Sequence, residues 1–371
     1  MLRECRLLVL GIALLLASCG GSDEREAASE RARGRAGERQ ALGAEDVAFG
    51  SSLAQIRGHH LASLELYRAG NTTGALVHAG HPIEEILASV RSELQTHYAS
   101  VAKSLEQALQ APAEHIRQGV SVQALQRTYD RAASVTRLAE SSIVGDLARS
   151  SEYKASVIAA LVGVSEHEYE EAVGEGETVK FLDEYQDAYG FLNEAQKLYV
   201  ALGSEVQQAS PEAADEIGRA FARLNKALPS TRPPDKLTSL PEVQSAAGLI
   251  ARNLTQALDA LPVEEADPDE AAAQIEQLLD QVLTAYSQGE VDRAEELTAE
   301  AYLQHYEDIE VAVISKAPDV NDQLEPLLGS ELRKKIQEKA PESEIEALVA
   351  RAKQLLREGL GALKEGARAA S

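Results

Sequence analysis

An all-α fold is predicted by the composition of this chain and by the spacing of its apolar residues. Ala, Leu, Glu, Gln and Arg dominate its 371 residues, and these are strong helix formers. Trp is absent, aromatic residues make up only 4% of the chain, and strand-like runs of Val, Ile, Thr and Tyr are missing. From about residue 46 the sequence reads as helix after helix, so we expect two tandem helical bundles.

The N-terminal residues 1–18 are predicted to be a lipoprotein signal peptide. Arg3 and Arg6 precede an apolar run that is about half the length of a membrane-spanning helix. The Leu-Ala-Ser-Cys sequence that follows resembles a bacterial lipobox, in which cleavage leaves Cys19 as a lipidated first residue. We therefore expect a lipid anchor at Cys19 in the cell envelope, on the periplasmic face of the outer membrane where the host has two membranes. An ordinary signal peptide with a chance cysteine is the alternative.

Changes in composition divide the rest of the chain. Residues 19–45 mix charges with Gly and Ala without apolar periodicity, so we expect a flexible tether. Four prolines between residues 228 and 242 prevent a continuous helix there. The predicted boundaries are therefore a first bundle at 46–228, a Pro-rich linker at 229–240 and a second helical domain at 241–371.

A short pattern occurs once in each predicted domain. The segments YRAGNTTGA from Tyr67 and YSQGEVDRA from Tyr286 share a Tyr, a Gly three residues later and an Ala eight residues later. Both predict a helix that ends at Gly and a second helix that begins just after it, as in an αα-hairpin. Either the two domains are related repeats, or this common helix-end pattern recurs by chance.

The net charge and the missing motifs exclude several functions. The formal charge is −24, and no basic patch is present that could bind the phosphates of a nucleic acid. No Gly-rich phosphate loop, nucleophile elbow or His-Glu-x-x-His metalloprotease motif occurs. We therefore expect no nucleic-acid partner and no enzymatic activity.

Histidines and carboxylates are concentrated in the first bundle, where they suggest a metal site. His60 shares an apolar helical row, whereas the ring of its neighbour His59 points about 100° away. A second group follows in VHAGHPIEEI, where a proline forces a helix junction or a kink. Imidazole and carboxylate groups at such a junction suit zinc, iron or copper. The residues of this second group are His78, His81, Glu84 and Glu85.

A further carboxylate, Glu184, falls on the apolar row of the helix predicted after residue 180. Asp187 aligns with the opposite row, so we expect it to be solvated. An inward Glu that faces inward histidines is how carboxylate metal sites in helical bundles are built. The alternative is structural, with His60 packed in the core and Glu184 paired with an Arg or a Tyr.

The second domain carries two carboxylates inside an apolar arc, Glu307 and Glu310. Two half-buried carboxylates one turn apart repel each other and lose hydration, so they need a cation, basic partners or a proton. An oxygen-preferring cation with Glu325 as a third ligand is one solution. Salt bridges with Arg333 or Lys334 are the other.

Residues 275–363 resemble the extracytoplasmic helical region of bacterial high-affinity iron permeases. The likeness lies in the Tyr-x-x-Gly turn, in AEAYLQHYEDIE, in PDVNDQLEPLLGSELRKKI and in the closing amphipathic helix. The resemblance implies that Glu307 and Glu310 form a Glu-x-x-Glu pattern that handles iron. It also implies a membrane iron permease as a partner.

The first bundle is similar, more faintly, to imelysin-type metal-binding lipoproteins with their Gly-x-His-x-x-Glu pattern. His81 and Glu84 have the His-x-x-Glu spacing, but Gly80 directly adjoins the histidine. Together these features predict a lipid-anchored extracytoplasmic protein that captures iron, or else copper or zinc, for a membrane uptake system. The alternative is a non-catalytic helical interaction module of the cell envelope with internally paired buried charges.

Overall fold

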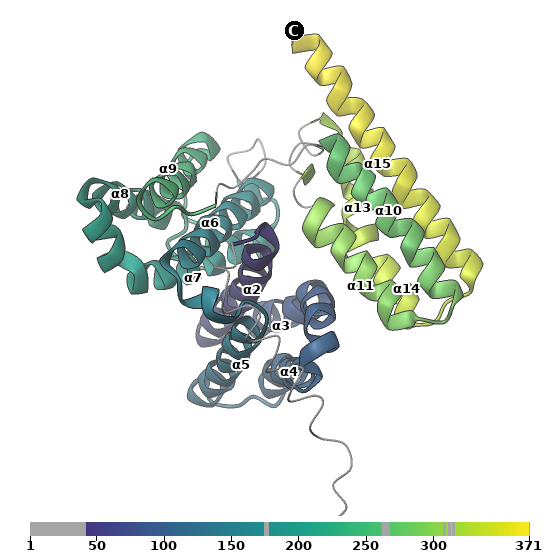
Figure 1. Ribbon diagram of the computed structural model, residues 1–371, viewed down its shortest axis with the longest axis horizontal. Coiled ribbons are helices and arrows are strands. Elements are labelled where there is room, and N and C mark those ends of the chain that lie inside the picture. The colour runs from purple at the N-terminus through teal and green to yellow at the C-terminus, as the bar shows by residue number, and fades with distance from the viewer. Residues whose placement is uncertain are drawn as a thin grey trace, which may run out of the picture. The chain divides into compact units, whose positions relative to one another are not determined.

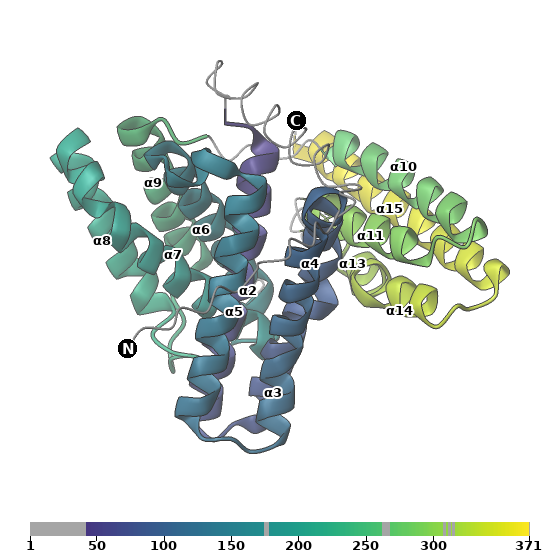
Figure 2. The same cartoon turned by 60° about the horizontal axis from the view of Figure 1, so that its bottom comes forward.

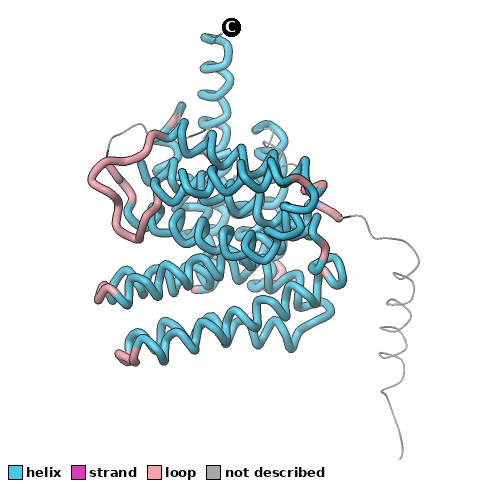
Figure 3. The backbone as a smooth tube through the Cα atoms, turned by 90° about the vertical axis from the view of Figure 1, so that its left-hand side faces the viewer, coloured by secondary structure: helices cyan, strands magenta, loops and turns pink. Residues whose placement is uncertain are grey.

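The computed structural model describes residues 42–173, 178–261, 268–306, 309, 310, 313 and 316–370. Every regular element in these ranges is a helix, as Figure 3 shows, which confirms the predicted all-α fold. Among the described helices we find none with the length and apolarity of a membrane span. The predicted signal peptide, Cys19 and most of the predicted tether lie outside the described residues.

The N-terminal helices pack around α2, which is buried on several faces. It contacts α3 and α5 as well as α6 and α7 from later in the chain. A π-helical turn, Pro82–Ile86, joins α3 to α4, and α4 and α5 run side by side (Figure 2). The helices are α2 (Ala44–Arg68), α3 (Thr72–His81), α4 (Leu87–Arg117) and α5 (Val122–Ile143).

Four further helices pack together after a 3₁₀ turn at Gly145–Arg149 (Figure 1). The last two of them are amphipathic; in α9, for example, Val243, Ile250 and Leu254 are buried on one face. Pro211 begins α8 at a position where a missing N–H costs nothing. The helices are α6 (Ser151–Val173), α7 (Leu182–Ala209), α8 (Pro211–Ala227) and α9 (Leu240–Leu258).

The packing of α9 differs from the predicted domain boundary at 229–240. This helix packs against α6 and α8, and its apolar residues join the same core as those of α2. The prolines interrupt the helix, but the chain then returns to cover an apolar face that α6 and α8 leave open. As a result, the first core extends to Ala260, and a separate core begins at Ala271.

The second core lies among the C-terminal helices. Its buried residues include Ile275, Leu297, Leu328 and Leu355. The elements around it are α10 (Pro268–Ser287), α11 (Val291–Ala301), a π-helical turn at Tyr302–Tyr306, α13 (Pro318–Pro326), a second π-helical turn at Leu327–Glu331, α14 (Leu332–Gln337) and α15 (Glu342–Ala370).

The predicted αα-hairpins are present in both halves. Gly70 has φ +81° and Gly289 has φ +77°, the left-handed conformation that ends a helix at low cost for glycine. The hydroxyl of Tyr67 donates to the carbonyl of Val120, and that of Tyr286 donates to the carbonyl of Ala340. In both halves the second helix of the hairpin runs into a π-helical turn. The shared sequence pattern therefore corresponds to a shared local structure.

Candidate metal centre

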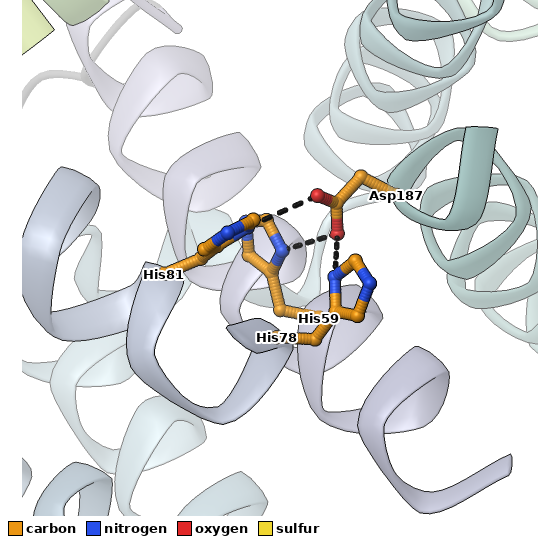
Figure 4. A group of neighbouring side chains, drawn as sticks. All are labelled: His59, His78, His81 and Asp187. Atoms are coloured by element: carbon orange, nitrogen blue, oxygen red, sulfur yellow. Dashed lines mark hydrogen bonds and ion pairs between the residues drawn. The ribbon is translucent and has the colours of Figure 1, made fainter. Parts of the chain in front are cut away.

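Three imidazoles converge on one carboxylate in the first core (Figure 4). His59 Nδ1 and His78 Nδ1 lie 2.5 and 2.8 Å from Asp187 Oδ1, and His81 Nδ1 lies 3.0 Å from Asp187 Oδ2. One ligand atom from each of the four residues lies within 4.8 Å of those of the others. We call this set the histidine centre.

A close helix crossing brings His59 of α2 to Asp187 of α7. Where the helices cross, Gly58 faces Gly190, and a Cβ added at Gly190 would meet the Gly58 carbonyl oxygen at 2.4 Å. A Cβ at Gly58 would meet the ring of Phe191 at 2.5 Å. Only a pair of glycines lets the two backbones come this close, and His59 follows directly after the contact.

The helix junction after α3 positions the other ligands. His78 and His81 occupy the last turn of α3, and Pro82 begins the π-helical turn as expected for a residue that cannot continue an α-helix. The turn brings Glu85 to 3.6 Å from His81 Nδ1 and 3.7 Å from His59 Nε2. Glu84, the residue with the His-x-x-Glu spacing, is exposed and outside the histidine centre. Of the two predicted glutamates, Glu85 therefore lies beside the histidine centre and Glu84 does not.

The histidine centre is shielded from solvent except at one residue. The side chains of His78, Asp187 and His59 are 0%, 2% and 4% exposed, whereas that of His81 is 14% exposed. His81 and Glu85 therefore form the side from which a cation would enter.

The contact with Gln186 fixes which ring nitrogen of His78 carries the proton when His78 is neutral. Its Nε2 donates to the carbonyl of Thr231 at 3.3 Å, so its Oε1 faces His78 Nε2 at 2.8 Å. Because an amide oxygen only accepts, His78 Nε2 carries a proton. The neutral form of His78 then has its lone pair on Nδ1, directed at Asp187 Oδ1. His78 Nδ1 and Asp187 Oδ1 are then two hydrogen-bond acceptors that face each other, and a proton or a metal ion must lie between them.

Without a metal, protons hold the histidine centre together. Burial would raise the pKa of Asp187, but His59 and His78 outweigh it and hold that pKa well below its usual range. Burial would lower the pKa of His81, but Glu85 and the hydrogen bond to Asp187 raise it to about 10. The pKa of His78 is also raised, since Asp187 outweighs its burial. A metal must displace these protons, so its affinity should increase with pH.

The donor set fits a first-row transition metal. Three imidazole nitrogens and a carboxylate oxygen suit zinc, iron or copper, with bonds of about 2.0–2.2 Å. Such bonds separate neighbouring ligand atoms by about 3–3.5 Å, so the nitrogen–oxygen contacts of 2.5–3.0 Å would lengthen, and any pair near the 4.8 Å limit would draw closer. The Gln186 contact is the outer partner that a metal-binding histidine usually has.

The structure confirms two of the predicted histidines as neighbours and corrects the third. His60 packs its ring on Tyr129, with centroids 4.7 Å apart, and is not part of the histidine centre. Burial lowers its pKa to about 3, so it is a neutral core histidine. His59 was expected about 100° away from the apolar row and Asp187 was expected to be solvated, whereas both are members of the histidine centre. Apolar periodicity gave the wrong expectation for these residues because α2 and α7 are buried on more than one face.

Glu184 points inward as predicted but belongs to a neighbouring carboxylate group. Ligand atoms of Glu168, Glu171 and Glu184 lie within 4.8 Å of one another. Burial and the nearby Asp187 raise the pKa of Glu184 well above its usual range, and burial and Glu184 do the same for Glu168. Glu184 therefore adjoins the histidine centre without being one of its four ligands.

Glu310 is buried, with only 1% of its surface exposed, as its apolar row predicts. Its carboxylate lies with His167 and Glu171 of α6 rather than with Glu325. Burial and the charge of Glu171 raise the pKa of Glu325 to about 7. Glu307, the other member of the predicted pair, lies outside the described residues.

The two predicted basic partners of that pair have different surroundings. Arg333 is buried, and its guanidinium lies 3.9 Å from Glu295. Lys334 is exposed. The ion pair described for Arg333 is therefore with α11.

Residues 145–261 match the model of one family, the iron permease-associated 4-helix bundle domain. The match spans α6, α7, α8 and α9, the four helices that pack together. The matched segment contributes Asp187 to the histidine centre, whereas the three histidines precede it. No curated protein and no solved structure was found to match the chain.

The predicted family is confirmed, but in a different segment. The resemblance was based on residues 275–363, whereas the match lies before them. Part of that resemblance was a Tyr-x-x-Gly hairpin turn, which also occurs at Tyr67, so the turn alone could not locate the domain. Residues 145–261 of this chain are therefore similar to the iron permease-associated 4-helix bundle domain.

Proposed function

We propose that this protein captures an iron ion at the histidine centre and delivers it to a membrane iron permease. The observation that carries the proposal is the convergence of three imidazoles on one buried carboxylate. The family of residues 145–261 is associated with iron permeases, which links the chain to iron uptake. The donors also suit copper and zinc, so the family association is what favours iron as the cargo.

The geometry supports reversible capture. Because His81 is the most exposed ligand, a cation can enter and leave past His81 and Glu85 without opening the core. The protons held at His78 and His81 compete with the cation, so mild acidity favours release. A carrier that hands its cargo to a permease needs such a balance between binding and release.

The proposed location is the cell envelope, with the protein anchored through a lipid on Cys19. The lipobox-like sequence at residues 16–19 supports this location. A lipid anchor would keep the captured iron beside the membrane that contains the permease.

Anaerobic calorimetric titration of the chelator-treated protein with Fe²⁺ tests the proposed capture, with elemental analysis of the recovered complex. We expect Asp187→Asn to lower the affinity of the histidine centre by about 100-fold or more, because it removes a ligand and the charge that binds three imidazoles. His97→Asn is the matched control, because His97 is an exposed histidine that is not part of the described metal-ligand groups. Wild-type protein that retains no iron, copper or zinc would refute the proposal.

A further inference from the structure

We propose a second cation site, formed by His167, Glu171 and Glu310 and extended by Glu168 and Glu184. It would take a divalent cation such as Fe²⁺ or Mn²⁺. The existence of the site is inferred from its geometry, whereas its use for the iron cargo rests on the proposed function. We call it the carboxylate site.

Two ligands of the carboxylate site come from one face of α6. His167 and Glu171 are one helical turn apart, and His167 Nε2 lies 3.3 Å from Glu171 Oε1. The Glu171 Oε1 atom is buried and has no hydrogen-bond partner in the described part of the chain. The two side chains therefore offer a nitrogen and an oxygen close together on one face of α6.

The third ligand comes from the other hydrophobic core. Glu310 lies between Ile309 and Val313, which are both 1% exposed, and its carboxylate reaches His167 and Glu171 within 4.8 Å. Elsewhere α11 contacts α4, where Arg293 donates to Ser92 at 3.5 Å. A cation bound here would therefore join α6 of the iron permease-associated domain to the C-terminal helices.

The adjoining carboxylates favour a cation at this place. Glu171 belongs both to this group and to the group with Glu168 and Glu184. Within the described ranges, none of these three has a Lys or Arg within salt-bridge distance. Half-buried carboxylates without a Lys or Arg partner must bind a cation, pair with a protonated His167 or hold protons themselves.

The two sites differ in chemistry and adjoin each other. The histidine centre offers three nitrogens and one carboxylate, whereas the carboxylate site offers one nitrogen and up to four carboxylates. The second set prefers a harder cation and discriminates better against copper. Glu184 and Asp187 are one turn apart on α7, and the charge of Glu184 acts on His81. A cation could therefore pass between the sites over a short distance.

Counting bound cations in the chelator-treated full chain tests the proposal. We expect two Fe²⁺ or Mn²⁺ per wild-type chain, and one in each of Glu171→Gln, His167→Asn and Glu310→Gln. Asp187→Asn should retain one, and the Asp187→Asn/Glu171→Gln double variant none. Glu170→Gln, which changes the neighbouring residue on α6, is the matched control and should retain two. Circular dichroism and thermal melting identify any variant that fails to fold, and the three single variants provide independent tests.

The outcomes separate the two proposals. One cation in the wild type and none in Asp187→Asn would overturn the carboxylate site and leave the histidine centre intact. One cation in the wild type that survives Asp187→Asn but is lost in Glu171→Gln would support the carboxylate site and overturn the proposed capture at the histidine centre. Two cations in both the wild type and Glu171→Gln would overturn the carboxylate site.

Discussion

His59 and His60 show how neighbouring residues of one type acquire opposite roles. Both are nearly fully buried, because α2 is covered on several faces. The ring of His59 contacts a carboxylate, whereas the ring nitrogens of His60 have no hydrogen-bond partner among the described residues. An imidazole without polar partners stays neutral, because burial penalises its charged form.

The neutral His60 should make the protein sensitive to acid. Its pKa is about 3 in the folded protein and about 6.5 when unfolded, so it contributes stability above pH 6.5 that is lost as the pH falls toward 3. Between pH 7 and pH 5 this loss is about 2 kcal/mol. Replacing His60 with Phe keeps the ring contact with Tyr129 and removes the titration. Urea unfolding of both proteins at pH 7 and pH 5 measures the difference.

The expected result is a difference in unfolding free energy that shifts by about 2 kcal/mol in favour of His60→Phe as the pH falls. Iron affinity should be unchanged, because His60 lies outside the histidine centre. Equal acid sensitivity in the two proteins would mean that His60 is protonated without cost in the fold.

At the scale of elements, the crossing of α2 and α7 determines the geometry of the histidine centre. The crossing places His59 and Asp187 on helices that are distant in sequence but in direct backbone contact through Gly58 and Gly190. The π-helical turn after α3 supplies the other half of the geometry, because it brings Glu85 rather than Glu84 to His81. Both features are departures from a regular helix bundle, and both bring side chains of the histidine centre or its neighbour Glu85 together.

We expect Gly190→Ala to weaken both the fold and the site. The new Cβ would lie 2.4 Å from the Gly58 carbonyl oxygen, so α2 and α7 must separate, at a cost of about 1–3 kcal/mol. His59 then moves away from Asp187, and iron affinity should fall by about tenfold or more, on the order of 1.4 kcal/mol. Thermal melts and calorimetry measure the two effects.

Gly203→Ala, in the same helix, is the control. Nothing lies within 4 Å of a Cβ at that position, so the change should stabilise the protein by up to about 1 kcal/mol and leave the iron site unaffected. If Gly190→Ala behaved like Gly203→Ala, the close crossing would not position the histidine centre.

At the scale of the whole molecule, some of the many acidic residues are grouped together in the structure. Most of its 60 acidic residues serve solubility, but several carboxylates meet in the interior around α6 and α7. The two hydrophobic cores are separate, yet Glu310 of the second reaches His167 and Glu171 beside the first. Cation binding and the association of the two groups of helices are therefore coupled in this proposal.

The proposed lipid anchor also concerns the molecule as a whole. Cys19→Ser removes the thiol that would carry the lipid, so this variant should move from the membrane fraction to the aqueous phase of a detergent partition. Cys5→Ser is the control and should remain with the membrane, because residue 5 belongs to the predicted signal peptide. Membrane association of the Cys19→Ser variant would exclude anchoring through this residue.

The helical class, the hairpins at Gly70 and Gly289, and the proximity of His78 and His81 were all predictable from sequence. Helix propensity, a glycine at a helix end and a proline beside two histidines are local signals, and local interactions decide them. The family link was also detectable, although the matched residues are 145–261. Such features need no knowledge of what packs against a helix.

Only the tertiary structure decided which histidine of the pair His59–His60 contacts a carboxylate, and that this carboxylate is Asp187. Apolar periodicity identifies one buried face of a helix, and it fails for α2 and α7, which contact neighbours on several faces. The predicted outward face of Asp187 is covered by α2 and α3, so a residue expected in solvent became the centre of the site. The packing of α9 onto the first core was hidden for the same reason, since the prolines mark where a helix stops and not where the chain goes next.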